Sequence, residues 1–95
     1  MGLIEPTNQL TVRENIEMLF PDENPMLFMD GLDDAIIGYC DKEMKVIYSA
    51  TKIIDELMHQ GMNDEEAIEY FEYNIDCAYI GKHTPIICQD GVLYL

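Results

Sequence analysis

The sequence predicts an α+β fold built as one small domain. Three segments carry apolar residues at helical spacing behind residues that cap helix N-termini, and short runs rich in Ile, Val and Tyr lie between polar turns. With 95 residues the chain can close one hydrophobic core, so we expect a single domain over residues 1–95. Its expected elements are a short N-terminal helix, a β-hairpin, two helices packed on one face of a mainly antiparallel sheet, and a C-terminal hairpin. Residues 1–10 precede the first helix signal, and we expect them to be poorly ordered.

The first helix is predicted from a capping box. Thr11 and Glu14 have the spacing at which each satisfies a free backbone N–H group of the other. We therefore expect a short helix over residues 12–19, which ends before Pro21. Its expected apolar edge consists of Ile16, Leu19 and Phe20.

Two hairpins are predicted from apolar runs that flank turn residues. Residues 33–40 lead into a strand of about six residues, and residues 45–48 form a second strand after a polar connection of hairpin length. Near the C-terminus, residues 86–89 and 92–95 flank Asp90-Gly91, a dipeptide that suits a type I′ turn because both of its positions take a positive φ.

Between these hairpins, a helix over residues 50–60 has clear signals at both ends. Ser49 is a favourable N-cap, and Gly61 is the residue expected to end a helix in a left-handed conformation. The apolar residues of this segment fall on one face at helical spacing: Ala50, Ile53, Ile54, Leu57 and Met58.

The last helix starts with a second box-like pair, Asn63 and Glu66, and is expected to end near Gly81. At about 100° per residue, one face of this helix is apolar and the opposite face is acidic. The apolar face comprises Ala67, Ile68, Phe71, Ile75 and Ala78.

Acidic side chains dominate the charge of the chain. The 19 Asp and Glu residues outnumber the 5 Lys and Arg residues, which gives a formal net charge of −14. Five basic residues do not provide the cationic face that neutralises nucleic-acid phosphates, and the negative excess opposes docking on an anionic membrane. Three cysteines without a Cys-x-x-Cys pair and a start without the pattern of a secretory signal favour reduced thiols and a cytoplasmic protein.

Four of these acids recur along the last predicted helix at intervals of four, three and four residues: Glu65, Glu69, Glu72 and Asp76. A helical rise of about 1.5 Å per residue places them roughly 4.5–6 Å apart along one side, which loosely matches the charge spacing of nucleic acid. One interpretation is a solvated helix face, and the other is a partner-binding surface that imitates nucleic acid. Tyr70 and Tyr73 border the acidic face and suit either an interface or the edge of a core.

A second acidic cluster lies in the loop before the first strand, at Asp30, Asp33 and Asp34. Mg²⁺ prefers such oxygen ligands, although turn-forming Asp and Gly also explain the segment, and its spacing is not that of an EF-hand. A metal or polar-ligand site therefore stays an alternative to a structural turn. His59 and His83 have no partner at metal spacing and no local nucleophile signature, so we assign no catalytic residue and favour a protein without enzymatic activity.

Three motifs resemble those of small tailed-bacteriophage proteins without an established activity. These motifs are DGLDDAIIG at residues 30–38, EEAIEYFEYN at residues 65–74, and Ala78-Tyr79-Ile80-Gly81 with Thr84-Pro85, within a resemblance that spans residues 27–88. The phage proteins often have Phe in place of Leu32 and of Tyr73, and Gly in place of Cys77. The resemblance implies a phage origin, and hence the cytoplasm of an infected bacterium. Its shared motifs draw attention to Asp30, Asp33, Asp34, Glu69, Glu72 and Asn74.

Three hypotheses follow. The leading one is a phage accessory protein, active in host takeover or anti-defence, that inhibits or modulates a basic host factor such as a nuclease, a polymerase or a repair enzyme; small acidic phage proteins that imitate DNA provide the analogy. The second is a small metal-dependent enzyme or nucleotide-binding protein centred on Asp30, Asp33 and Asp34. The third is a homo-oligomeric structural or sequestering protein that associates through the apolar strand at residues 92–95.

Overall fold

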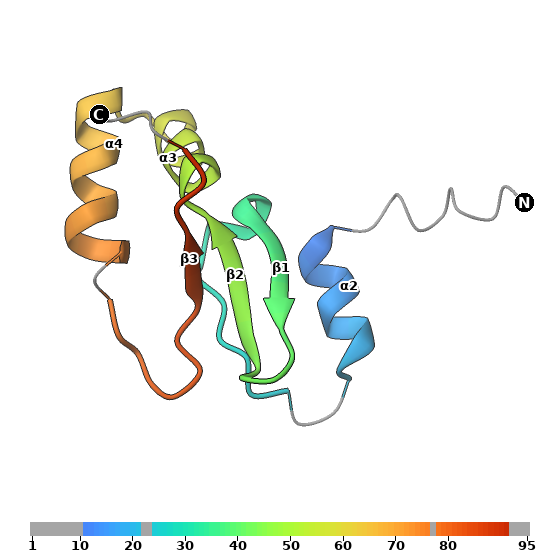
Figure 1. The fold of residues 1–95 in the computed structure, drawn as a ribbon. Helices are drawn as coiled ribbons and strands as arrows, with labels where there is room; N and C mark the ends of the chain where they lie inside the picture. Colours follow the sequence, from blue (N-terminus) through green and yellow to red (C-terminus); the bar gives the residue numbers. More distant parts are fainter. Residues whose placement is uncertain (1–10, 22–23, 77, 92–95) are drawn as a thin grey trace, which may run out of the picture.

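The computed structural model describes residues 11–21, 24–76 and 78–91, and its elements follow the predicted order (Figure 1). The α+β class is confirmed. The expectations for residues 1–10 and for a strand at residues 92–95 lie outside the described residues. The elements of the described part are α2 (Val12–Leu19), the 3₁₀ turn η1 (Asp33–Ala35), β1 (Ile36–Cys40), β2 (Lys45–Ser49), α3 (Ala50–His59), α4 (Asp64–Tyr70), the π-helical turn η2 (Phe71–Asp76) and β3 (Ile86–Cys88).

The described strands form one sheet in the order β1-β2-β3. The predicted first hairpin is confirmed, because β1 and β2 pair antiparallel, with Cys40 opposite Lys45. The expectation of a mainly antiparallel sheet is corrected by β3, which pairs parallel with β2, so that Ile47 lies opposite Ile86. Parallel strands need a crossover connection, and α3 and α4 lie within the connection between β2 and β3.

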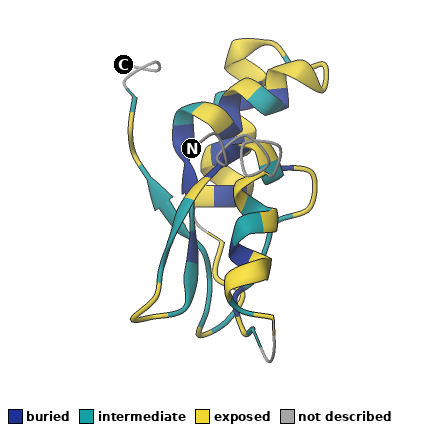
Figure 2. Cartoon of the chain, turned by 90° about the vertical axis from the view of Figure 1, so that its right-hand side faces the viewer, coloured by how far each residue is buried: buried dark blue, intermediate teal, exposed yellow. Residues whose placement is uncertain are grey.

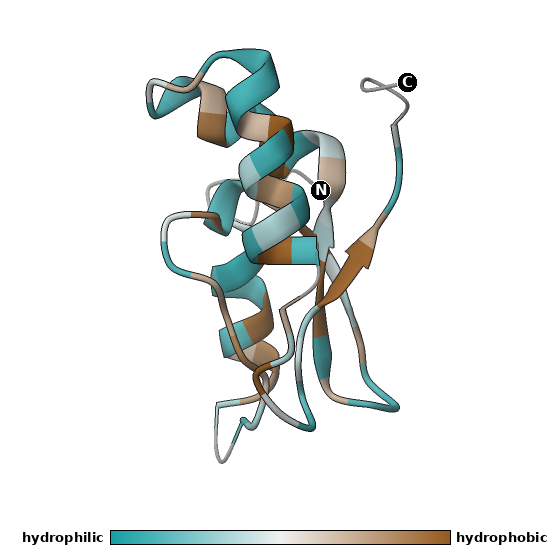
Figure 3. Ribbon diagram, turned by 90° about the vertical axis from the view of Figure 1, so that its left-hand side faces the viewer, coloured by the Kyte–Doolittle hydropathy of each residue, from teal (hydrophilic) through white to brown (hydrophobic). Residues whose placement is uncertain are grey.

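The helices lie on one side of the sheet (Figures 2 and 3), as was predicted for the two that follow the hairpin. Apolar residues from every helix and from β1 and β2 fill the space between the two layers, and the strongly apolar β3 forms an edge of the sheet (Figure 3). The largest fully buried side chains are those of Tyr48, Phe71, Ile16, Ile53, Ile54 and Val46.

Two residues of the predicted apolar faces of α2 and α3 are exposed instead. Leu19 is 61% exposed, because the contacts of α2 with the core are made by Ile16 and Phe20, which lie four residues apart. The Phe20 ring packs edge-on against Tyr39 of β1, with the ring centroids 5.3 Å apart. Met58 of α3 is 41% exposed, since its neighbour Leu57 fills the core at that end of the helix.

Tyr48 connects the centre of the sheet to the loop before η1. Its side chain is fully buried, and its hydroxyl oxygen accepts a hydrogen bond from the Met29 backbone N–H at 2.7 Å. Burial raises the pKa of the Tyr48 phenol above its ordinary value. This bond fixes the path of the chain directly before Asp30.

The capping signals of α2 and α3 are confirmed. Thr11 and Glu14 form the predicted capping box, with bonds of 3.0 and 3.1 Å. Ser49 Oγ accepts the Lys52 N–H at 3.1 Å at the start of α3. At the other end, Gly61 has a φ of 115° and forms a Schellman motif, in which the N–H groups of Gly61 and the next residue bond to carbonyls of the last helical turn.

Asp90 contributes a second cap to α3 that the sequence did not indicate. Its carboxylate accepts hydrogen bonds from Ser49 Oγ, from Thr51 Oγ1 at 2.8 Å and from the Thr51 backbone N–H at 3.0 Å. These bonds lower the pKa of Asp90 from 3.8 to about 2. The expected type I′ turn requires a positive φ at Asp90. That expectation is wrong, because the one non-glycine residue with a positive φ in the described part of the chain is Met44.

Candidate functional site

Negative charge is concentrated on α4 and η2. The capping box of α4 is confirmed, since Asn63 Oδ1 accepts the Glu66 N–H at 2.8 Å and Glu66 Oε1 accepts the Asn63 N–H at 2.9 Å. Acids in the first turn are also favoured by the positive end of the helix dipole. Within residues 64–76 the sequence holds no Lys, Arg or His, and its carboxylates are those of Asp64, Glu65, Glu66, Glu69, Glu72 and Asp76.

The helix that carries these acids is not regular over its whole length. The prediction of one α-helix to about Gly81 is wrong, because regular α-helix ends at Tyr70 and a π-helical turn follows. A π-helical turn has i→i+5 hydrogen bonds and is wider than an α-helical turn, so angular positions computed at 100° per residue fail beyond Tyr70. Phe71 and Ile75 stay buried, whereas Ala78 is exposed. The predicted single row of acids is therefore divided between α4 and η2.

The four predicted carboxylates of this row are all exposed to solvent. Among the described residues the ion pairs are made by Arg13 and Lys45, and none of them reaches α4 or η2. Asp76 accepts a hydrogen bond from Gln89 Nε2 at 3.1 Å, which connects η2 to the residue after β3. No cation of the described part thus neutralises these four acids.

A surface groove brings together three of the predicted partner-binding residues, Glu69, Tyr70 and Tyr73, with Asn74, to which the shared motifs drew attention. The groove has a volume of about 510 Å³, and its lining residues are Met62, Glu66, Glu69, Tyr70, Tyr73 and Asn74. Tyr73 is 77% exposed and Tyr70 is 43% exposed, so both aromatic rings are accessible to a partner. Glu65, Glu72 and Asp76 are not among the lining residues.

A smaller hollow of about 190 Å³ adjoins the groove at Tyr70, which lines both. Asp30 and Gln60 are its polar lining residues, beside Met29, Leu32, Leu57 and Ile75. Gln60 Nε2 also donates to the Gly31 carbonyl at 3.4 Å, which holds the aspartate loop against the end of α3. The two candidate sites predicted from the sequence, the acidic helix and the aspartate loop, therefore meet at Tyr70.

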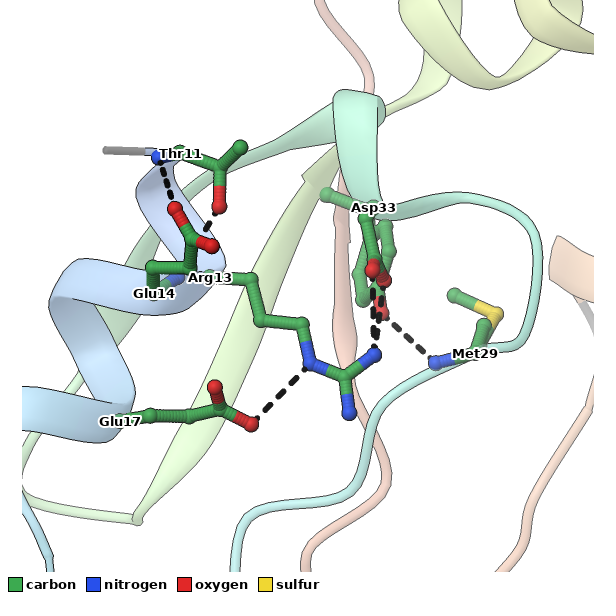
Figure 4. A network of polar contacts seen from close by, with 7 residues as sticks. Thr11, Arg13, Glu14, Glu17, Met29 and Asp33 are labelled. Carbon is green, nitrogen blue, oxygen red and sulfur yellow. Dashed lines mark hydrogen bonds and ion pairs between the residues drawn. The ribbon is translucent and has the colours of Figure 1, made fainter. Parts of the chain in front are cut away.

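Asp33 is engaged by a side chain from another element (Figure 4). Both of its carboxylate oxygens accept hydrogen bonds from one terminal nitrogen of Arg13, at 3.0 and 3.1 Å. The same guanidinium donates through Nε to Glu17 at 3.3 Å and lies 4.3 Å from the ring centroid of Phe28. Arg13, the one arginine of the chain, thus joins α2 to η1 and to the preceding loop.

The three aspartates of the loop do not form a metal cluster in the described part of the chain. Asp33 is paired with Arg13, while Asp30 and Asp34 are exposed. Over residues 11–21, 24–76 and 78–91, no group of three or more His, Cys, Asp or Glu side chains is placed to hold a metal ion.

Both histidines make hydrogen bonds with backbone carbonyls. His59 Nδ1 lies 2.9 Å from the Asp55 carbonyl oxygen within α3. His83 Nδ1 lies 3.1 and 3.0 Å from the carbonyl oxygens of Glu43 and Met44, which connects the loop before β3 to the β1–β2 turn. No serine or cysteine hydrogen-bonds to either histidine among the residues that the structure describes.

Comparisons with known proteins assign this chain to no family. None of the described helices is long and apolar enough to cross a lipid bilayer. No protein-family model matches the chain, and no curated protein or solved structure is significantly similar to it.

Proposed function

We propose that this chain is a non-enzymatic bacteriophage accessory protein that binds a host protein of the infected bacterium at a basic, nucleic-acid-binding surface. The observation that carries the proposal is the set of exposed carboxylates on α4 and η2, which no cation of the described residues neutralises. Such a surface attracts a basic partner over roughly one Debye length, about 8 Å at physiological salt. By occupying that surface, the protein competes with nucleic acid for it.

The other two hypotheses gain less support from the geometry. The Arg13–Asp33 pair gives the aspartate loop a structural role, which weakens the case for a metal or nucleotide site there. The hypothesis of self-association depends on residues 92–95, which lie outside the described residues.

The test is competition with duplex DNA. A tagged chain captures partners from a bacterial lysate, and each purified partner is titrated with the chain in the presence of a labelled duplex. We expect the chain to displace the duplex, and we expect its affinity to fall steeply between 50 and 500 mM salt. The proposal is contradicted by a partner that binds the chain and the duplex at the same time, or by an affinity that does not change with salt.

A variant with four neutralised acids tests the surface itself. Since each exposed charge pair contributes about 0.2–1 kcal/mol, we expect affinity to fall on the order of tenfold or more. The substitutions are Glu65→Gln, Glu69→Gln, Glu72→Gln and Asp76→Asn. The matched control removes four acids outside α4 and η2 and is expected to have a smaller effect; its substitutions are Asp34→Asn, Asp41→Asn, Asp55→Asn and Glu56→Gln. If the two variants lose the same affinity, net charge alone drives binding.

A further inference from the structure

The groove beside Tyr70 and Tyr73 contains a carboxylate that no described residue pairs with. Glu66 uses one oxygen to accept the Asn63 N–H in the capping box, whereas Glu69 makes no hydrogen bond or ion pair within the described part of the chain. None of the residues that line the groove is basic. A free carboxylate beside two accessible aromatic rings favours a cationic occupant.

The chain contains a related arrangement with its cation in place. Arg13 hydrogen-bonds the carboxylates of Glu17 and Asp33 (Figure 4), and its guanidinium lies 4.3 Å from the centroid of the Phe28 ring. The groove offers the same set of groups, two carboxylates and an aromatic ring, from Glu66, Glu69 and the two tyrosines. Because Arg13 is the one arginine of the chain and is already engaged, an arginine for the groove has to come from another molecule.

We propose that this groove binds the guanidinium group of an arginine on the partner. A guanidinium is planar, stacks on aromatic rings and donates two parallel hydrogen bonds to one carboxylate, whereas the ammonium of lysine is a compact and strongly hydrated charge. The side-chain amide of Asn74 supplies an oxygen that can accept a further N–H group. The inference rests on the proposed function and narrows it, because it makes one arginine of the basic partner the anchor of the interface.

The experiment compares two peptides of equal charge, hexa-arginine amide and hexa-lysine amide, in calorimetric titrations at 50 and 150 mM salt. The variants are Tyr73→Leu and Glu69→Gln in the groove, and Glu72→Gln outside it. Glu72→Gln is the matched control, because it removes the same charge from an exposed position of η2, directly after α4. Circular dichroism of each variant confirms that the fold is retained.

We expect wild-type protein to bind the arginine peptide about two- to fivefold more tightly than the lysine peptide, the range that a cation–π contact at an exposed site supplies. Tyr73→Leu should abolish this preference. Glu69→Gln should weaken the binding of the arginine peptide about threefold more than Glu72→Gln does.

The other outcomes separate this inference from the proposed function. If both peptides bind with the same salt-dependent affinity, or if Glu69→Gln and Glu72→Gln weaken binding equally, the groove is not an arginine site although the acidic surface still attracts cations. If neither peptide binds at 50 mM salt, the inference and the proposed function both fail.

Discussion

Asp90→Asn tests whether one carboxylate, distant in sequence, stabilises the start of α3. The wild-type carboxylate accepts bonds from Ser49 Oγ and from both the hydroxyl and the backbone N–H of Thr51. The difference between a pKa of 3.8 and one of about 2 corresponds to about 2 kcal/mol if fully expressed. Because the residue is exposed and water screens its interactions, we expect a loss of about 1 kcal/mol at neutral pH.

The pH dependence of this effect has a definite sign. Folding lowers the pKa of Asp90, so its stabilisation is complete above the unfolded pKa, near 4, and disappears as the pH falls toward about 2. Urea unfolding of wild type and Asp90→Asn should therefore give free energies of unfolding that differ at pH 6 and converge near pH 2.

A control separates this local effect from the relief of general repulsion in a chain with a net charge of −14. Asp55→Asn removes one exposed charge from the middle of α3, and it should leave stability unchanged or slightly increased. If Asp90→Asn behaves like Asp55→Asn, or if its effect persists at pH 2, the reasoning about the cap is refuted.

Four further substitutions test other features of the fold. Arg13→Lys should lower the free energy of unfolding by about 1 kcal/mol, because an ammonium does not reproduce the stacking and the bridging of two carboxylates; an unchanged urea midpoint would contradict this. Tyr48→Phe leaves the Met29 N–H without a partner and should cost about 1–3 kcal/mol at pH 7. Since burial raises the pKa of Tyr48, wild type should also lose stability above pH 10, where the unfolded chain releases the proton first, and alkaline urea titrations should show a smaller loss in the variant. Gly61→Ala should cost about 1–2 kcal/mol in thermal or urea unfolding because its φ is 115°, whereas Gly38→Ala, with nothing within 4 Å of an added Cβ, should change stability by less than about 0.5 kcal/mol; equal effects would argue against backbone strain.

Local signals predicted much of the fold. Thr11, Ser49 and Asn63 each cap the helix that was expected to follow them, and Gly61 ends α3 as expected. These interactions join residues within a few positions of one another, so a single sequence contains the information needed to find them.

Features that depend on distant residues were missed. The Arg13–Asp33 pair spans 20 positions and has no periodic signature. The parallel pairing of β3 depends on how α3 and α4 pack, which the short apolar run Ile86–Cys88 does not indicate.

The exposure of the acidic residues was predicted, but their arrangement was predicted only in part. The exposure of Glu65, Glu69, Glu72 and Asp76 agrees with a simple helical wheel, since charged residues remain in water. The wheel failed after Tyr70 because η2 has a wider turn. The approach of Asp30 to Tyr70 depends on tertiary packing, and the sequence motifs only placed both residues among the candidates.

The late position of β3 has a consequence for how the chain matures during translation. The β1–β2 hairpin is local and can form early, but Asp90 lies 41 positions after the Ser49 hydroxyl that it binds, so the nascent chain must first close a large loop. Until then, the free edge of β2 exposes unpaired N–H and C=O groups that another nascent chain can join. Repulsion between such acidic chains opposes this association, so the acidic composition of the sequence favours solubility before the native state forms.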